Sequence, residues 1–344
     1  DSALLRRVEC DIINSDNKFK VTDTCKDGLE ALEKLRTKKY DGVVLDINMP
    51  RMDGLELLQQ LQKEKIKANI VMASTLTVEG ADEAIKSLEL GAIDFVTKPS
   101  NIIEAKGDAF KKALLDVLYA ATKARVHFKK PSLTPAADKT AASSVNRLKK
   151  PGQNKIIAIA SSTGGPKALQ SVIPKIPADI DAPVVLVQHM PAGFTSSMAA
   201  RLNELSKVQV KEAEDGELLK KGVVYIAPGG KHIVVNKKGA SHVIGYSDMP
   251  PIGGLKPCAN IMFDSLGQTG FDEVVCVVLT GMGADGTNGI LSLGKKKSVH
   301  VIAQDESSCI VYGMPRAIYE AGVVDEVVAL SKVAETITKN VGVK

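Results

Sequence analysis

Apolar positions in the first 121 residues follow two alternating patterns. Helical spacing of apolar residues predicts helices over residues 4–13, 29–35, 55–61, 81–90 and 110–121. Short apolar runs between them predict strands over residues 19–25, 42–47, 69–73 and 93–97. Because helices and strands alternate, we expect an α/β domain whose parallel sheet is covered by helices on both faces.

The pattern is interrupted between residues 122 and 154. This stretch carries Pro131, Pro135 and Pro151 among Ala, Ser, Thr and Lys, without a sustained apolar period. Such a composition is typical of a linker. The chain is therefore predicted to consist of a domain at 1–121, a linker at 122–154 and a second domain at 155–344.

The α/β pattern returns in residues 155–344. Apolar runs predict strands over residues 156–160, 184–188, 274–280 and 299–303, and each is followed by a turn of small residues and a helical pattern. Residues 208–246 contain short alternating runs punctuated by glycine, which predict an antiparallel excursion.

Composition excludes several classes of protein. A hydrophobic content of 44% with 25% charged residues is typical of a globular protein. The five cysteines are scattered and form no C-x-x-C pair, which favours free thiols in a reducing cytoplasm. No apolar run reaches the roughly 18 residues of a membrane span, so we expect no membrane insertion. Much of the net charge of +5 comes from lysines and arginines around the linker, which favours a solvated segment over a nucleic-acid surface.

Polar side chains stand at the predicted ends of three strands in the first domain. They are Asp46, Ser74 and Lys98. The carboxyl ends of parallel strands meet at one edge of a sheet, so these groups are predicted to form a pocket. There an aspartate could accept a phosphoryl group while a lysine and a divalent cation neutralise its oxygens. Taken singly, Asp46 is a polar strand end and Lys98 a surface lysine; the surrounding motifs favour the pocket.

Two motifs carry a specific resemblance. D-x-N-M-P-x-M-D-G at 46–54 and F-V-T-K-P-S at 95–100 make residues 1–121 similar to the receiver domains of two-component response regulators. The resemblance implies a flavodoxin-like, doubly wound parallel sheet. It also implies that Asp46 is the phosphorylated residue, with Ser74 as the switch hydroxyl and Lys98 as the site lysine.

The metal that such phosphorylation requires is implied by the same resemblance. Mg²⁺ prefers oxygen ligands, and Asp1, Asp46 and Asn48 are the expected donors. Receivers begin with an apolar strand that ends in two adjacent acids, whereas this sequence begins at the second acid. We therefore expect the first strand to be missing through truncation of the sequence.

Three segments of the second domain carry the residues of a serine hydrolase. Residues 161–166 read Ser-Ser-Thr-Gly-Gly-Pro between a strand and a helix, where the helix N-terminus favours an oxyanion. His189 follows the strand predicted at 184–188 and could act as general base. Asp285 lies in the turn 279–286 and could orient the imidazole.

Each of these residues also has a structural interpretation. Ser162 alone is more often a helix cap, His189 a strand-end histidine and Asp285 an N-cap. Their shared position at three strand ends favours a catalytic site. The physical argument does not distinguish Ser161 from Ser162 as the nucleophile.

A second motif overlaps the turn with Asp285. Gly281, Gly283 and Gly286 satisfy G-x-G-x-x-G between a strand and a helix, and Asp305 follows about 20 residues later, so a dinucleotide-binding enzyme is the alternative. Asp285 would place a carboxylate beside the pyrophosphate, and Ser162 and His189 would have no role. A regulator with a nucleic-acid-binding output has less support, since no helix-turn-helix is evident.

The order Ser162, His189, Asp285 resembles the catalytic domain of the chemotaxis methylesterases, the CheB family. Further matches are M-P-A-G-F at 190–194, I-A-P-G-G at 226–230, K-P at 256–257 and Y-G-M-P at 312–315. The resemblance implies a Rossmann-like α/β hydrolytic domain with Ser162 as nucleophile, His189 as base and Asp285 as its partner.

The family pattern also implies the surroundings of the nucleophile. Thr163 and Gly164 are expected beside the reaction centre, and Met282 is expected to give a backbone N–H to the oxyanion hole. Position 161 holds Ser where the family commonly has a small apolar residue.

The resemblance covers nearly the whole chain. It implies a phosphorylation-regulated cytoplasmic enzyme that hydrolyses glutamate methyl esters, and deamidates glutamines, on methyl-accepting chemotaxis receptors. The expected phosphodonor is the chemotaxis histidine kinase. No cofactor is expected for the esterase, and no nucleic-acid partner.

Overall fold

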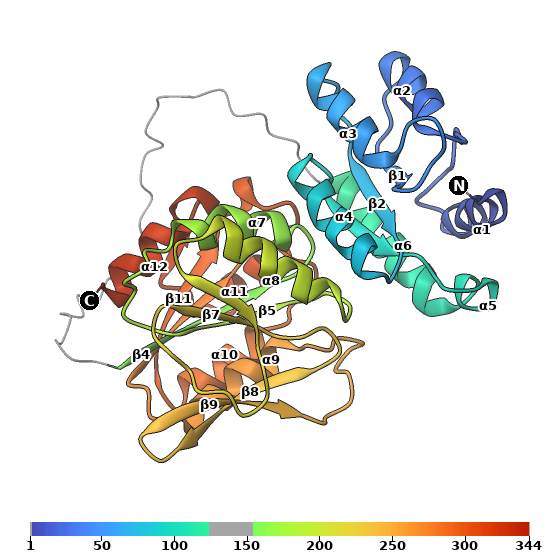
Figure 1. Cartoon of the computed structure of the whole chain (residues 1–344). Helices are drawn as coiled ribbons and strands as arrows, with labels where there is room; N and C mark the ends of the chain where they lie inside the picture. Colours follow the sequence, from blue (N-terminus) through green and yellow to red (C-terminus); the bar gives the residue numbers. More distant parts are fainter. Residues whose placement is uncertain (1, 124–153, 344) are drawn as a thin grey trace.

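The computed structural model describes residues 2–123 and 154–343 and shows two α/β domains packed against each other (Figure 1). The predicted linker falls almost entirely outside the described residues; its first two positions belong to helix α6. Within the described ranges, no helix combines the length and apolar content needed to cross a membrane.

The first domain is built on a three-stranded parallel sheet of order β1-β2-β3. The strands are β1 (Val43–Asp46), β2 (Ile70–Ser74) and β3 (Asp94–Thr97). The helices are α1 (Ala3–Asn14), α2 (Gly28–Thr37), α3 (Gly54–Lys63), α4 (Val78–Glu89), α5 (Ile102–Ala105) and α6 (Asp108–Lys123). The Asp-Gly turn after β1 starts helix α3 because Asp53 and Glu56 form a reciprocal capping box.

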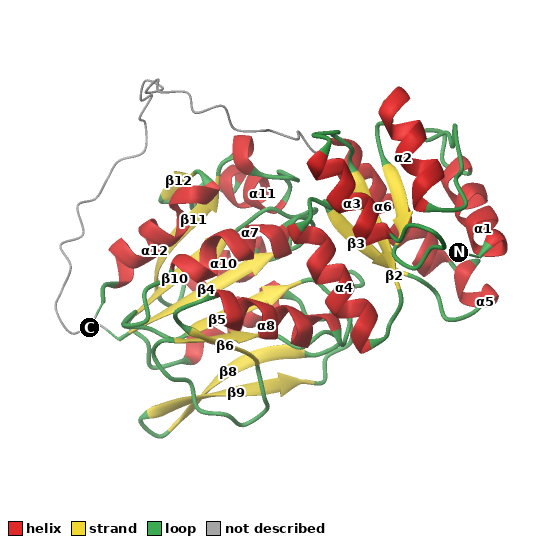
Figure 2. Ribbon diagram, turned by 45° about the horizontal axis from the view of Figure 1, so that its top comes forward, coloured by secondary structure: helices red, strands yellow, loops and turns green. Residues whose placement is uncertain are grey.

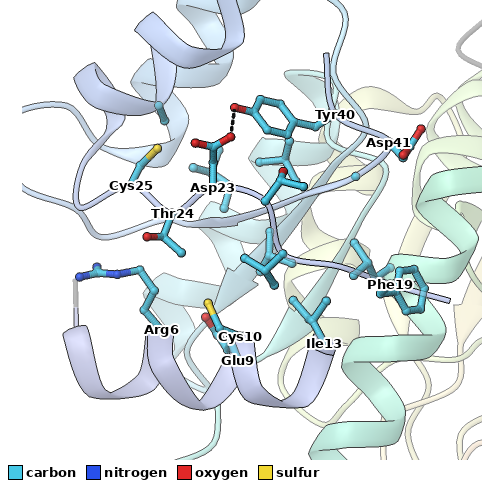
Figure 3. A pocket seen from close by; sticks show the side chains of 18 of the residues that line it. Arg6, Glu9, Cys10, Ile13, Phe19, Asp23, Thr24, Cys25, Tyr40 and Asp41 are labelled. Carbon is cyan, nitrogen blue, oxygen red and sulfur yellow. Dashed lines mark hydrogen bonds between the residues drawn. The ribbon is translucent and has the colours of Figure 1, made fainter. Parts of the chain in front are cut away.

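The strand predicted over residues 19–25 is not formed. This segment runs beside a cavity of about 780 Å³ that is also lined by β1, α1 and the end of α6. Figure 3 shows Asp23, Thr24 and Cys25 on one side of that cavity, with Tyr40 and Asp41 from the approach to β1. The Val21 N–H is donated to the Asn14 side chain at 2.8 Å rather than to a neighbouring strand. The prediction was wrong because a strand needs a backbone partner, and no described strand pairs with residues 19–25.

The second domain contains a seven-stranded parallel sheet of order β12-β11-β10-β4-β5-β7-β6. Its strands are β4 (Lys155–Ser161), β5 (Val184–Gln188), β6 (Gln209–Glu212), β7 (Val223–Ile226), β10 (Glu273–Val278), β11 (Ser298–Gln304) and β12 (Glu326–Val328). The helices are α7 (Gly165–Val172), α8 (Phe194–Leu205), α9 (Ala259–Ser265), α10 (Thr287–Gly294), α11 (Met314–Glu320) and α12 (Val333–Val341). The helices lie on both faces of this sheet (Figure 2).

The antiparallel excursion is only partly as predicted. An antiparallel hairpin does form from β8 (His232–Lys238) and β9 (Ser241–Ser247). However, β6 and β7 extend the main sheet in parallel beside β5. The local pattern predicts that a segment is extended, whereas the direction of pairing depends on where the chain returns to the sheet.

The order in which strands are added to the sheet of the second domain reverses between β4 and β10. From β4 the chain builds outward through β5, and it later returns to add β10 on the other side of β4. In open α/β sheets such a switch point leaves a crevice at the carboxyl ends of the strands. This edge carries the residues described below.

Helix α4 of the first domain packs against α7 and α8 of the second. Phe95 stacks on Phe194 with ring centroids 4.6 Å apart, and one apolar cluster includes side chains from both domains. Glu89 at the end of α4 forms an ion pair with Arg201 on α8. The receiver-like domain is therefore docked on the carboxyl edge of the second sheet.

Candidate functional site

The first domain brings Asp46 and Lys98 together. Asp46 ends β1, Lys98 follows β3, and the ammonium forms a direct ion pair with the carboxylate. Both side chains are largely buried, which strengthens the interaction compared with a surface pair. A lysine in this position can neutralise oxygens attached to Asp46.

The other predicted residues of this pocket have different roles. Ser74 ends β2 and is buried, and its hydroxyl donates to the Gly80 carbonyl in α4 at 2.6 Å. The backbone N–H of Asn48 donates to Asp46 at 3.1 Å. Asp1 lies outside the described residues. Asp46 and Asn48 offer the oxygen donors that Mg²⁺ prefers, although the described residues contain no group of three acidic, histidine or cysteine ligands.

In the second domain, the three predicted catalytic residues follow three adjacent strands. Ser162 follows β4, His189 follows β5, and Asp285 lies in the turn after β10. Since β4 lies between β10 and β5, the loop that carries Ser162 starts from the strand between those that lead to Asp285 and His189. The Ser162 N–H donates to the Thr280 carbonyl at 3.1 Å, which joins the serine loop to the acid turn.

Asp285 and His189 are in direct contact. Nε2 of His189 lies 2.8 Å from Oδ2 of Asp285, and both side chains are more than nine-tenths buried. Burial alone would raise the pKa of Asp285, but its hydrogen bonds with His189 and the Ala259 N–H hold that pKa at about 2. The carboxylate is thus an acceptor, and Nε2 must carry the hydrogen. In the neutral ring Nδ1 is left as the basic nitrogen.

Asp285 is also held by a turn that the sequence analysis did not identify. The carboxylate accepts the N–H groups of Ala259 at 2.6 Å, Asn260 at 3.0 Å and Gly286 at 2.9 Å, and the Cys258 thiol at 3.1 Å. No local motif relates residues 258–260 to a carboxylate 25 positions away. Such a set of donors fixes the carboxylate and keeps it ionised.

Several backbone N–H groups around Ser162 are already in use. Those of Ser162 and Gly165 donate to carbonyls, and that of Gly164 donates to Asp94. Within the described part of the chain, the N–H groups of Thr163 and Met282 have no protein acceptor. The Ser162 hydroxyl likewise makes no hydrogen bond there, so it is free for a reaction.

The contact with Asp94 comes from the receiver-like domain. Its Oδ2 accepts the Gly164 N–H at 3.2 Å, and its Oδ1 accepts the Phe95 N–H at 2.9 Å. Burial raises the pKa of Asp94 to about 7, although these two N–H groups oppose the shift. Gly164 itself must be glycine, because its φ is +75° and a Cβ would lie 2.7 Å from Ile310. The first domain thus contacts the loop that carries Ser162.

The G-x-G-x-x-G turn does not resemble a free pyrophosphate cradle. The Gly286 N–H at the start of α10 donates to the carboxylate of Asp285. Gly281 packs against Ser162, since a Cβ there would lie 2.8 Å from the serine Cβ. Gly281 therefore allows the turn that carries Asp285 to approach Ser162.

The fold and the two sites define a class of protein: an α/β serine hydrolase joined to a domain with a phosphoryl-acceptor pocket. Residues 157–337 match the family model described as CheB methylesterase, and residues 1–106 match that of the response regulator receiver domain. The chain belongs to the CheB methylesterase family.

Individual proteins show the same relationship. The protein-glutamate methylesterase/protein-glutamine glutaminase of Halalkalibacterium halodurans is 41% identical over 98% of this chain and 96% of its own length. The protein of the same name from Bacillus subtilis is also 41% identical, over 98% of this chain and 96% of its own length. The crystal structure of the Thermotoga maritima CheB methylesterase catalytic domain is 40% identical and covers 55% of this chain and 99% of that chain, with a TM-score of 0.53.

Proposed function

We propose that the protein hydrolyses glutamate methyl esters, and deamidates glutamine side chains, on methyl-accepting chemotaxis receptors. The observation that carries this proposal is the hydrogen bond between His189 and Asp285 at the sheet edge where Ser162 follows the intervening strand. The relatives, which match nearly the whole chain, are protein-glutamate methylesterases/protein-glutamine glutaminases and support this substrate class.

We propose a role for each member of the triad. His189 Nδ1 takes the proton of the Ser162 hydroxyl as its oxygen attacks the ester carbonyl, and Asp285 stabilises the imidazolium through Nε2. Collapse of the tetrahedral intermediate gives an acyl-serine, and the proton passes to the leaving methoxide to form methanol. Water, activated by His189, then releases the glutamate carboxylate. With an amide substrate the same steps release ammonia.

The oxyanion is proposed to bind the N–H groups of Thr163 and Met282. Both groups are without a protein acceptor in the described ranges and lie on the two loops that meet at Ser162. Gly164 would be a third donor, but in the docked arrangement Asp94 occupies its N–H. Fixed backbone donors of this kind are worth about 10²–10³-fold in rate each.

Regulation is proposed to act through the docked receiver. Phosphorylation of Asp46 would replace its ion pair with Lys98. It would also attract the Ser74 hydroxyl, which in this structure donates to the Gly80 carbonyl in α4. Helix α4 contacts α7 and α8, so a change at Ser74 would loosen the interface and release Asp94 from Gly164. Mg²⁺, when held by Asp46 and Asn48, would offset charge on the phosphoryl oxygens.

The partners follow from this chemistry. The substrate is a receptor with accessible methylated glutamates, and the phosphodonor is a chemotaxis histidine kinase. Both interactions place the proposed activity in the cytoplasm. No organic cofactor is proposed for the esterase.

The experiment is methanol release from methylated receptor membranes by the wild-type protein and by Ser162→Ala. Activity that disappears in the variant supports the proposal. Equal release by both proteins would show that Ser162 is not the nucleophile. A folded wild-type protein that releases no methanol, even after removal of residues 1–153, would contradict the proposed substrate.

A further inference from the structure

A buried glutamine joins the backbones of the nucleophile and the base. Gln188 is the last residue of β5, and its side chain is only 2% exposed. Its Nε2 donates to the Ser162 carbonyl at 3.0 Å and to the His189 carbonyl at 3.2 Å. Both amide hydrogens are therefore used on the two residues that carry the reaction.

The orientation of this amide is fixed by a second buried group. The Ser161 hydroxyl, which is fully buried, donates to Gln188 Oε1 at 2.7 Å. Ser161 and Gln188 are direct partners in the register of β4 and β5. If the amide were rotated by 180°, its oxygen would face two carbonyl oxygens and its nitrogen would face a hydroxyl. One arrangement therefore satisfies all the polar atoms of the network.

The nucleophile loop also closes tightly on the glutamine. A Cβ at Gly165 would lie 2.0 Å from Gln188 Oε1 and 2.9 Å from the Ser161 Cβ. The Gly165 N–H returns to the Ser162 carbonyl at 2.7 Å, so the amide and the first residue of α7 hold the same carbonyl. The loop cannot shift relative to β5 without breaking these contacts.

We propose that Gln188 is a positioning residue for the hydrolysis, and that Ser161 acts through it by fixing the orientation of its amide. Together, Gln188 and Ser161 determine the position of the Ser162 hydroxyl relative to His189. The inference rests on the proposed function, because it concerns the same nucleophile and base. Position 161, which the sequence analysis noted as a departure from the family pattern, thereby has a role in this chain.

A positioning role predicts a loss in turnover rather than in substrate binding. Misplacement of reacting groups by about 1 Å costs about 10²-fold in rate. Gln188→Glu keeps the shape but removes both donors, so we expect kcat to fall about 100-fold with KM within about threefold of wild type. Ser161→Ala removes one hydrogen bond to the amide, for which we expect a loss of about fivefold in kcat.

The experiment measures kcat and KM for methanol release and, separately, the rate at which a fluorophosphonate labels Ser162. The labelling reaction needs the serine and histidine but no receptor. Matched controls are Gln209→Glu, on the exposed start of β6, and Ser171→Ala, whose hydroxyl bonds only its own helix. Thermal unfolding is measured for every variant.

The proposal expects both Gln188→Glu and Ser161→Ala to slow labelling by the same factor as kcat, while the controls leave both rates unchanged. The double variant should lose no more than Gln188→Glu alone, because the two residues act as one unit. If Gln188→Glu does not fold, Ser161→Ala decides the outcome. A folded Ser161→Ala protein with wild-type kcat and labelling rate, or a change confined to KM, would overturn the inference. Labelling without methanol release by the wild-type protein would instead count against the proposed substrate.

Discussion

Asp94 gives the docked receiver a dependence on pH that a single substitution can reveal. Its carboxyl is buried against the loop that carries Ser162, and its pKa is raised from 3.8 to about 7 by that burial. We expect the group to return to water and to its ordinary pKa when the domains separate. A carboxyl whose pKa is higher in the docked form favours docking when protonated. Docking is therefore most stable below about pH 4 and loses stability as the pH rises towards 7.

The magnitude follows from the difference of about three pKa units. At about 1.4 kcal/mol per unit, ionised Asp94 opposes docking by about 4 kcal/mol at pH 8. Asp94→Asn removes this charge. The asparagine oxygen accepts only one of the two N–H groups, so docking loses about 1 kcal/mol of hydrogen-bond stabilisation. The variant should therefore dock about 3 kcal/mol more tightly than wild type at pH 8.

The assay is methanol release by the unphosphorylated full chain, with Asp94→Asn compared with wild type at each pH. The ratio of the two activities cancels the titration of the catalytic residues. We expect wild type to exceed the variant by up to about 100-fold at pH 8, with the ratio rising up to about tenfold per unit between pH 5 and 7 and constant above. Asp82→Asn, which changes an exposed carboxylate on α4, is the matched control. A ratio that does not change with pH, or a variant that is more active than wild type at pH 8, would refute the reasoning.

Three further changes test other parts of the structure. Asp285→Asn should lower kcat about 10³–10⁴-fold in methanol release, because an amide cannot hold His189 in the same tautomer; a loss under tenfold would contradict the assigned triad. Gly165→Ala should destabilise the catalytic domain by about 1–3 kcal/mol, seen as a lower thermal midpoint, since its Cβ would lie 2.0 Å from Gln188; an unchanged midpoint would show that the loop can move. Lys98→Ala should abolish stimulation by a small phosphodonor while leaving unstimulated activity measurable, and a full response would exclude Lys98 from the switch.

Much of the sheet architecture could be predicted because buried parallel strands are continuous apolar runs. β1, β2, β4 and β5 all lie within predicted strands or differ from them by a residue or two at their ends. The errors concern pairing. The segment at 19–25 has the composition of a strand but no partner, and β6 and β7 are extended as expected but join the sheet in parallel. Strand pairing depends on segments that are distant in the sequence, so the local hydrophobic period does not predict it.

The same distinction applies to the sites. Asp46 and Lys98 could be predicted to meet, as could His189 and Asp285, because residues at the ends of parallel strands of one sheet converge. The groups that position these site residues could not be predicted from the sequence. Nothing in the sequence around Cys258 or Asn260 indicates that both will donate to Asp285, and nothing around Asp94 points to Gly164 in another domain. These contacts depend on tertiary packing.

In the proposed function, phosphorylation of the receiver controls a hydrolase that uses Ser162. The most direct measurement is methanol release from methylated receptor with and without a small phosphodonor and Mg²⁺, for wild type, Asp46→Asn and Ser162→Ala. We predict a rate that rises with the phosphodonor in wild type, a low and unresponsive rate in Asp46→Asn, and none in Ser162→Ala. A phosphodonor response that survives in Asp46→Asn, or methanol release that survives in Ser162→Ala, would contradict the account.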